Sequence, residues 1–277
     1  MMIGIFGASG LIGSELFRFL KARGESVLGT YCATQRDGLE KFDIATDPFS
    51  IFDDCTCVVI AGGISNIDEC FRDKDHAFKI NVEKTKELIE YLAGRHRKPI
   101  FLSSGQIFDG KKGFYKEEDE PNPLNCYGEY KLCVEEFMKE QLDDYLILRL
   151  SKIYSRDPDV ASMFSEILNR LKRAEVASVP CNQKYNPTDV RFVSKGIHEA
   201  IEGNLVGLYH LAEGKVMSRY DFALQVAGEY GLDAGLVEKS CFRNLPGREK
   251  KAIDTSLDAT KFYRKTGLTD EAAKSSA

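Results

Sequence analysis

The sequence predicts an α/β fold in which a doubly wound parallel sheet carries helices on both faces. Short apolar runs alternate with amphipathic helical stretches, which is the pattern of repeated strand–helix–strand units. Within each run the apolar residues occupy successive positions, as expected of strands buried on both faces. Because crossovers between parallel strands are right-handed, these units wind into a doubly wound sheet.

The elements of the first half follow in order along the chain. Five short apolar runs are expected to be strands: Ile3–Phe6, Ser26–Tyr31, Cys57–Ala61, Pro99–Ser103 and Tyr145–Leu150. Three stretches between them have helical periodicity: Leu11–Arg23, Asp75–Ala93 and Tyr127–Leu142.

The pattern is less regular after about residue 155. The expected elements there are a helix at Ala161–Arg173, a strand at Gly207–Ala212 and a helix at Tyr220–Tyr230. A polar stretch with prolines, Pro180–Pro187, separates them, and Asp270–Ala277 is expected to be a frayed tail. The second half is therefore predicted to be a smaller region folded against the first.

Composition excludes several classes of protein. The 277 residues carry a formal net charge of −5, so no basic surface indicates binding to nucleic acid or to an anionic membrane. No apolar run approaches the ~20 residues of a membrane span. The chain starts directly in a strand, without the charged and apolar regions of a signal peptide, and its eight cysteines are scattered. We expect a cytoplasmic protein.

No metal site is expected. Cys55 and Cys57 form the only close cysteine pair, and residues two apart in a strand share one face, so both are expected to line the core. The four histidines show no ligand spacing.

A glycine-rich turn joins the first strand to the first helix. Gly7, Gly10 and Gly13 recur at intervals of three, with Ser9, Leu11 and Ile12 between them. Such a turn lets backbone N–H groups approach a pyrophosphate at the helix N-terminus, where the helix dipole favours negative charge. Its place after a strand and before a helix predicts a site for an NAD-type dinucleotide. Residues 1–155 are therefore expected to form a Rossmann domain, and residues 156–277 a mainly substrate-binding region, parts of which return to the Rossmann sheet.

The end of the second strand bears on the choice of dinucleotide. An NAD site usually has an acidic residue there for the ribose 2′-hydroxyl, but this strand ends at Tyr31 without one. Arg36 follows, with Thr30 and Thr34 as hydroxyl partners, which favours the 2′-phosphate of NADP(H) over NAD(H).

Tyr127 and Lys131 are candidates for proton transfer. Four residues apart in a helical stretch, they share one face, and a nearby ammonium lowers the pKa of a phenol. Tyr127 would then donate a proton to a carbonyl or accept one from an alcohol. Ser103 and Ser104, at the carboxyl end of the fourth strand, would lie where ligands bind in such folds.

These motifs together resemble the extended short-chain dehydrogenase/reductases, and within them the dTDP-4-dehydrorhamnose reductase family. The resemblance rests on the glycine turn and on a long stretch that contains Ser103–Gly110, Glu117–Asn125 and Tyr127–Lys131. Later segments are similar to further landmarks of that family: Asn186–Thr188, Gly207–Leu211 and Leu257–Lys261.

The resemblance implies a role for each site residue. Ser104 would polarise the substrate carbonyl, Tyr127 would donate the proton, Lys131 would hold the nicotinamide ribose, and Asn81 would support the proton relay. Further residues would line the dinucleotide site: Asp43 and Ile44 at the adenine, with Ala61, Gly62 and Gly63 after the third strand. The implied reaction reduces the 4-keto group of a nucleotide-activated deoxysugar. Glu15 matches an acidic position that some members use for a magnesium-bridged dimer, and the superfamily often forms homodimers.

Several departures from the family cluster near the expected substrate. Gly105-Gln106 replaces Asp-Tyr after the serine, Ala61-Gly62-Gly63 replaces Asn-Ala-Ala, and Pro246-Gly247-Arg248 only loosely matches a late Arg-Pro element. The charged candidates for a substrate diphosphate are Arg149, Lys152, Arg191 and Arg248.

Two other functions remain open from the sequence. One is an epimerase or dehydratase of the same superfamily. The other is a cofactor-binding regulatory subunit, since the family includes the beta subunit of methionine adenosyltransferase.

Overall fold

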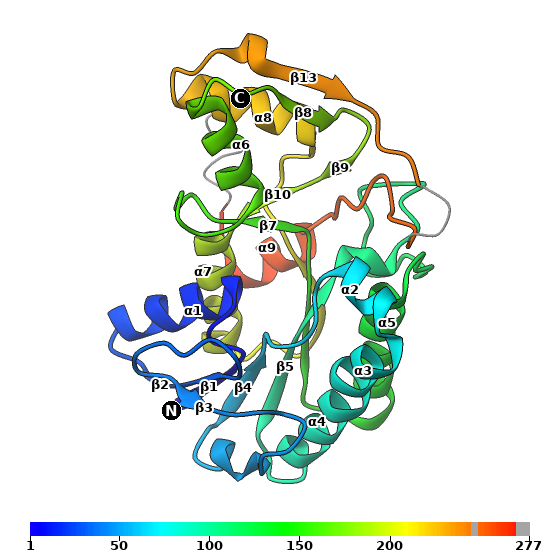
Figure 1. Ribbon diagram of the computed structural model, residues 1–277. Coiled ribbons are helices and arrows are strands. Elements are labelled where there is room, and N and C mark those ends of the chain that lie inside the picture. Colours follow the sequence, from blue (N-terminus) through cyan, green and yellow to red (C-terminus); the bar gives the residue numbers. More distant parts are fainter. Residues whose placement is uncertain (245–248, 270–277) are drawn as a thin grey trace.

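A computed structural model describes residues 1–244 and 249–269 of the chain, and its centre is a parallel sheet (Figure 1). The sheet has seven strands in the order β11-β6-β5-β4-β1-β2-β3, and all neighbours are parallel. Its strands are β1 (Met2–Phe6), β2 (Ser26–Tyr31), β3 (Glu40–Lys41), β4 (Cys57–Ile60), β5 (Lys98–Ser104), β6 (Leu146–Leu150) and β11 (Gly207–Leu211). The strand order changes direction between β1 and β4, which is where such sheets bind ligands. The predicted fold class is confirmed.

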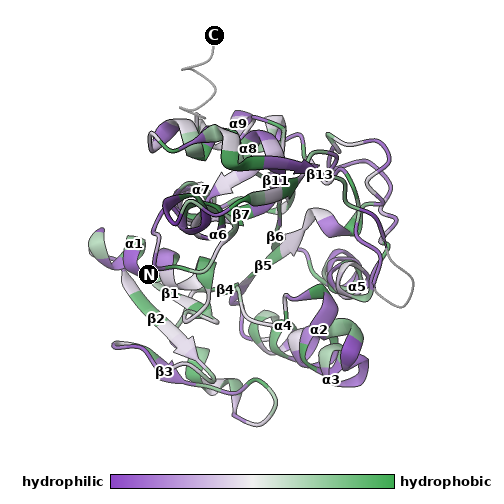
Figure 2. Ribbon diagram, turned by 45° about the horizontal axis from the view of Figure 1, so that its top comes forward, coloured by the Kyte–Doolittle hydropathy of each residue, from purple (hydrophilic) through white to green (hydrophobic). Residues whose placement is uncertain are grey.

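Helices cover both faces of the sheet. One face packs against α1 (Leu11–Ala22), α7 (Val190–Glu202) and α9 (Thr260–Thr266), through buried residues such as Ile5, Val59 and Val193. The other face packs against α4 (Thr85–Ala93) and α5 (Cys126–Gln141). Figure 2 shows both hydrophobic and hydrophilic residues along α1 and α3 (Lys74–Phe78). Amphipathic helices bury one face against a sheet in this way.

A smaller body built from the second half of the chain lies beyond the carboxyl ends of the strands (Figure 1). Its core forms between α6 (Met163–Lys172), α8 (Arg219–Glu229) and a strand pair, β8 (Ala177–Pro180) with β13 (Val237–Ser240). Two further pairs connect it to the sheet: β7 (Lys152–Tyr154) with β10 (Pro187–Asp189), and β9 (Lys184–Tyr185) with β12 (Met217–Ser218). Short single turns complete the described chain: η1 (Phe49–Phe52), η3 (Gly105–Ile107) and η4 (Ala234–Leu236).

The predicted elements differ from the structure in several places, and β3, the short strands of the second half and α9 were not predicted. The expected helix Asp75–Ala93 is divided into α3, a π-helical turn η2 (Lys79–Lys84) and α4, and α2 (Ile67–Arg72) precedes it. Asn66 caps the start of α2, and Asp73 caps the start of α3. Each cap therefore begins a new helix. Helix α7 was not predicted, although Asp189 caps it and Val190, Val193 and Ile197 are buried at helical spacing. The predicted tail Asp270–Ala277 lies outside the described residues.

Within residues 1–244 and 249–269, none of the helices combines the length and the apolar character needed to cross a membrane.

Candidate active site

A cavity of about 660 Å³ opens at the carboxyl ends of the strands, over the point where the strand order changes direction. The glycine turn, the ends of β2 and β4, and α5 line it. Most of the catalytic and cofactor-binding residues selected from the sequence lie around this cavity: Gly7, Ser9, Gly10, Leu11, Ile12, Tyr31, Asp43, Ile44, Ala61, Gly62, Gly63, Asn81, Ser104, Tyr127 and Lys131. Among the residues selected for the dinucleotide, Gly13 and Arg36 do not line it.

The glycine turn is held by β2 and by the end of β4. The Ala8 N–H donates to the Thr30 carbonyl at 2.7 Å, and the Gly7 N–H donates to the Thr30 hydroxyl at 3.3 Å. Gly7 has a φ of +86°, and a Cβ at this position would lie 2.5 Å from the Gly62 backbone. This close approach explains the glycine at position 7, whereas a Cβ on Gly62 would lie 2.6 Å from the Phe6 ring. Thr30 lines the cavity with little of its side chain exposed, and its predicted contact with a 2′-phosphate stays a prediction.

The first turn of α1 is open to an anion. Gly10 is the residue before the helix, no side chain caps this end, and the first turn has no acidic residue. The N–H groups of Leu11 and Ile12 therefore face the cavity without partners inside the helix. Free N–H groups and the helix dipole together favour a phosphate at this point.

At the adenine end of the cavity, Asp43 is tied to its own turn. Its carboxylate accepts from the Ala45 N–H at 2.9 Å, and its own N–H donates to Asp47 at 2.7 Å. Arg36 lines an adjoining cavity of about 630 Å³, which shares only Leu11 with the first. The preference for NADP(H) therefore stays a prediction.

Ser104, Tyr127 and Lys131 meet on one wall of the cavity. The Lys131 ammonium donates to the Leu102 carbonyl at 2.8 Å and lies 5.8 Å from the centroid of the Tyr127 ring. Burial lowers the pKa of Lys131 to about 8. Burial also raises the pKa of Tyr127 to about 12, while a hydrogen bond with Ser104 acts in the opposite direction. The prediction that Lys131 lowers the Tyr127 pKa toward neutrality is therefore wrong for the chain alone, because desolvation of the phenolate dominates.

Two neighbouring residues that were not predicted as part of the site, Asn125 and Gly128, bring α5 to Ser104. The Asn125 side chain caps α5 by accepting from the Gly128 N–H at 2.9 Å, and it donates to the Lys250 carbonyl at 3.0 Å. A Cβ on Gly128 would collide with the Gln106 carbonyl, so this glycine lets the helix approach the loop after β5. An asparagine directly before a helical stretch is the capping signal that could have identified Asn125.

Asn81 supports the cavity from the π-helical turn. It is buried, accepts from the Ile64 N–H at 2.8 Å and donates to the Ile64 carbonyl at 2.9 Å. This fixes the segment after β4 that lines the cavity. Turns of π-helix are frequently found at functional sites.

Ser103, the alternative to Ser104, belongs to a buried network behind the site. Its hydroxyl donates to Glu135 at 2.5 Å, and Glu135 is paired with Arg149 at 2.7 Å. The Arg149 and Glu135 side chains are 1% and 0% exposed. The predicted contact of Arg149 with a substrate is therefore wrong, since both groups are inside the core.

A second cavity, of about 620 Å³, adjoins the first on the side of the smaller body. Lys152, Arg219 and Lys251 line it. Burial lowers the pKa of Lys152, and the charges of Arg219 and Lys251 lower it further. Arg219 is paired with Glu166 at 2.5 Å and Lys251 with Asp68 at 2.9 Å. The Tyr185 hydroxyl and the Arg219 Nε are buried without a hydrogen-bond partner among the described residues. Lys184 also lines this cavity, and a cavity with four cations favours an anionic ligand.

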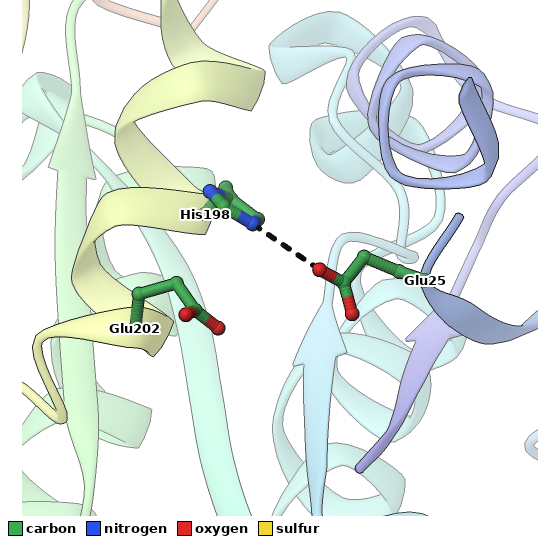
Figure 3. A group of neighbouring side chains, drawn as sticks. All are labelled: Glu25, His198 and Glu202. Carbon is green, nitrogen blue, oxygen red and sulfur yellow. Dashed lines mark ion pairs between the residues drawn. The ribbon is translucent and has the colours of Figure 1, made fainter. Parts of the chain in front are cut away.

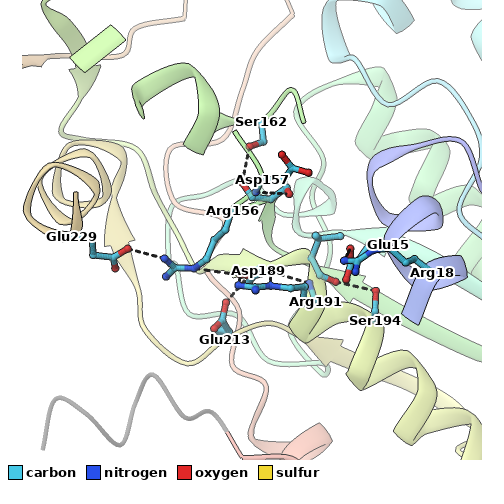
Figure 4. A network of polar contacts seen from close by, with 12 residues as sticks. Glu15, Arg18, Arg156, Asp157, Ser162, Asp189, Arg191, Ser194, Glu213 and Glu229 are labelled. Atoms are coloured by element: carbon cyan, nitrogen blue, oxygen red, sulfur yellow. Dashed lines mark hydrogen bonds and ion pairs between the residues drawn. The ribbon is translucent and has the colours of Figure 1, made fainter. Parts of the chain in front are cut away.

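The other charged candidates lie elsewhere. Arg191 is paired with Asp189 at 2.7 Å and belongs to a network that also contains Arg156 (Figure 4). That network lines the adjoining cavity with Arg36, so Arg191 does not face the second cavity. Arg248 lies outside the described residues. Glu15 is paired with Arg18.

The chain matches a known family over almost its whole length. Residues 1–276 match the family described as RmlD substrate binding domain. The chain is 26% identical over 275 residues to a protein of Haloferax volcanii named "Probable low-salt glycan biosynthesis reductase Agl14", covering 95% of this chain and 91% of that one. It is 28% identical over 280 residues to a dTDP-4-dehydrorhamnose reductase of Aggregatibacter actinomycetemcomitans, covering 95% and 92%. It is also 25% identical over 239 residues to methionine adenosyltransferase 2 subunit beta of Bos taurus, covering 82% and 72%.

Solved structures are similar over the same length. A hypothetical dTDP-4-dehydrorhamnose reductase from Sulfolobus tokodaii superimposes with a TM-score of 0.85 at 29% identity, covering 98% of this chain and 96% of that one. The dTDP-4-dehydrorhamnose reductase of Bacillus anthracis, in complex with NADP, has a TM-score of 0.83 at 20% identity, covering 97% and 92%. At that identity the likeness shows the fold alone.

Proposed function

Because the chain belongs to the RmlD substrate-binding domain family, we propose that it is a nicotinamide-dependent reductase of a nucleotide-activated 4-keto deoxysugar. Relatives named as reductases match nine tenths or more of its length. The substrate class follows from the name of the reductase of Aggregatibacter actinomycetemcomitans, a dTDP-4-dehydrorhamnose reductase.

One structural observation supports this proposal most. The two cavities share a wall that contains Ser104 and Tyr127, so a dinucleotide in the first and a substrate in the second would meet at these side chains. When bound in the first cavity, a reduced nicotinamide would supply the hydride. The Ser104 hydroxyl would donate a hydrogen bond to the carbonyl oxygen, and Tyr127 would give that oxygen its proton. Hydride and proton together convert the ketone to the alcohol.

The remaining selected residues would hold the dinucleotide. We assign the pyrophosphate to the open turn at Gly10–Ile12, and the ribose next to the nicotinamide to Lys131. Asp43, Ile44 and Tyr31 would surround the adenosine, and Ala61–Gly63 would line the middle of the site. We propose NADP(H) rather than NAD(H), because β2 ends without an acidic residue.

The second cavity would bind the substrate through its charge. Lys152 forms no ion pair with any described residue. Its pKa is lowered by burial and by the charges of Arg219 and Lys251. A diphosphate would relieve this repulsion. We therefore assign the diphosphate of the nucleotide sugar to these three cations.

Three further proposals describe the protein as a whole. Residues 1–155 would be the dinucleotide-binding domain and residues 156–277 mainly the substrate-binding region, with β11 contributed to the sheet by the second. All eight cysteines are free, which favours the reducing cytoplasm. A homodimer is proposed by analogy with the superfamily.

The test is NADPH oxidation with dTDP-activated 4-keto sugars, by the wild type and by Tyr127→Phe. We expect the variant to lose ~10²–10⁴-fold in kcat, the usual contribution of a proton donor, and to keep its cofactor affinity. Tyr130→Phe is the matched control, because Tyr130 lies on the same helix but lines neither cavity. Net oxidation would separate a reductase from an epimerase, which returns the hydride. Tight cofactor binding without oxidation of any keto sugar would instead favour the regulatory subunit.

A further inference from the structure

A group of three possible metal ligands lies outside the two cavities, and Figure 3 shows its side chains. Glu25 stands in the turn between α1 and β2, directly before the first residue of β2. His198 and Glu202 are four apart on α7, so both side chains share one face of that helix. The group therefore lies at the amino ends of the strands, and none of its members lines the first or the second cavity.

His198 is the member that points to a ligand. Its side chain is 6% exposed, and neither ring nitrogen has a hydrogen-bond partner among the described residues. The ring is held edge-on against Phe19, with 5.8 Å between the centroids. Figure 3 shows one ring nitrogen directed at Glu25, and the distance from Nε2 to the carboxylate is 3.6 Å. That is too long for a hydrogen bond, so the cost of burying this imidazole is not offset.

The separations fit a metal ion between these groups. We propose that His198, Glu25 and Glu202 bind one Zn²⁺ ion. Zinc lies ~2.0–2.2 Å from imidazole nitrogen and carboxylate oxygen, so two ligands of a tetrahedral ion are ~3.4 Å apart. Nε2 and the Glu25 oxygen are 3.6 Å apart, and one ligand atom from each of the three residues lies within 4.8 Å of the others.

The chemistry of the ligands selects the ion. One nitrogen and two carboxylate oxygens are a ligand set of zinc, whereas magnesium and calcium prefer oxygen alone. Glu202 is exposed, so its carboxylate can turn toward the ion, and water would complete the coordination.

The consequence would be structural. The ion would join the turn after α1 to α7, two helices that pack together on the same face of the sheet. Because all three ligands are assembled only in the folded chain, the ion would stabilise it.

The experiment uses the full chain after treatment with a chelator. Calorimetric titration with ZnCl₂ is expected to show one site, and the unfolding temperature is expected to rise by about 5 °C when free zinc exceeds the dissociation constant a hundredfold. MgCl₂ at the same concentration is expected to give no rise. His198→Gln and Glu25→Gln should remove the zinc-dependent rise.

Two further variants distinguish a loss of zinc binding from a loss of folding. Glu202→Gln changes an exposed side chain and is expected to weaken zinc binding at least about tenfold. Glu199→Gln is the matched control, since it makes the same change on α7 outside the group and should bind zinc as the wild type does. An equal response of His198→Gln and the wild type would assign the zinc to other groups, such as the exposed cysteines, and overturn the proposal. No response of the wild type would overturn it as well.

Discussion

Replacing Gly13 by alanine tests whether the glycine turn depends on close contact between α1 and the residues that directly follow β1. A Cβ at position 13 would collide with the Gly7 carbonyl oxygen and lie 2.8 Å from the Ala8 Cα. Carbon atoms in contact are normally ~3.5–4.0 Å apart, so the helix would have to move by at least about 0.7 Å. The obstructing atoms belong to the backbone, and no side-chain rotation can relieve the contact.

The magnitude follows from two opposing effects. Overpacking of this kind costs ~1–3 kcal/mol, and backbone obstruction places Gly13→Ala at the upper end. Alanine in a helix gains up to about 1 kcal/mol over glycine, so the net loss of unfolding free energy is about 2 kcal/mol.

Gly228→Ala is the matched control. Gly228 lies in α8, and a Cβ there would meet nothing within 4 Å. This variant should gain up to about 1 kcal/mol, so the two substitutions should differ by about 3 kcal/mol.

The assay is thermal unfolding of both variants, with an expected difference of roughly 6–10 °C between them. The movement of α1 should also displace the N–H groups that face the first cavity. Titration with NADPH should then show weaker binding by Gly13→Ala and unchanged binding by Gly228→Ala. Equal unfolding temperatures of the two variants would refute the role assigned to this contact.

Three further predictions concern the site and its support. The pKa of Lys131 is lowered to about 8 and that of Tyr127 is raised to about 12, so Lys131 loses its proton first. A plot of kcat/KM against pH should therefore be level near pH 7 and fall above about pH 8. A rate that rises above pH 8 would contradict the roles assigned to these two residues. Arg149→Met should lower the free energy of unfolding by about 3–5 kcal/mol, because Glu135 stays buried without its partner, and adding Glu135→Leu should recover most of this in urea unfolding. Arg36→Ala should weaken NADPH binding about tenfold and leave NADH binding unchanged, because a guanidinium pairs with phosphate and only NADPH carries the 2′-phosphate. An equal loss of affinity for both cofactors would count against a contact between Arg36 and the 2′-phosphate.

The lowered pKa of Lys131 also has a consequence for stability. In the unfolded chain its pKa returns to 10.5, so between about pH 8 and 10.5 the unfolded state binds the additional proton. Stability linked to this group therefore rises with pH across that window. Lys131→Met should remove this rise, which urea unfolding at several pH values would measure.

The features that the sequence determined by itself are local ones. The glycine turn, the spacing of Tyr127 and Lys131 and the apolar strands each depend on residues close together in the chain, and backbone geometry alone converts these spacings into shape. They were sufficient to predict the α/β class and to select the residues that surround the first cavity.

Tertiary structure decided what depends on residues far apart in the sequence. Lys152, Arg219 and Lys251 come from three separate segments, and only folding brings their charges around one cavity. Arg149 looked like a ligand for phosphate until folding placed it beside Glu135 in the core.

The same reason applies to the other groups that the sequence did not reveal. His198 shows no ligand spacing with the other histidines, because its neighbour Glu25 lies at the other end of the chain. The pKa of Tyr127 depends on burial more than on the spacing to Lys131. Periodicity reports which face of an element is apolar, but electrostatic interactions depend on distance and desolvation, which exist only once the chain has packed.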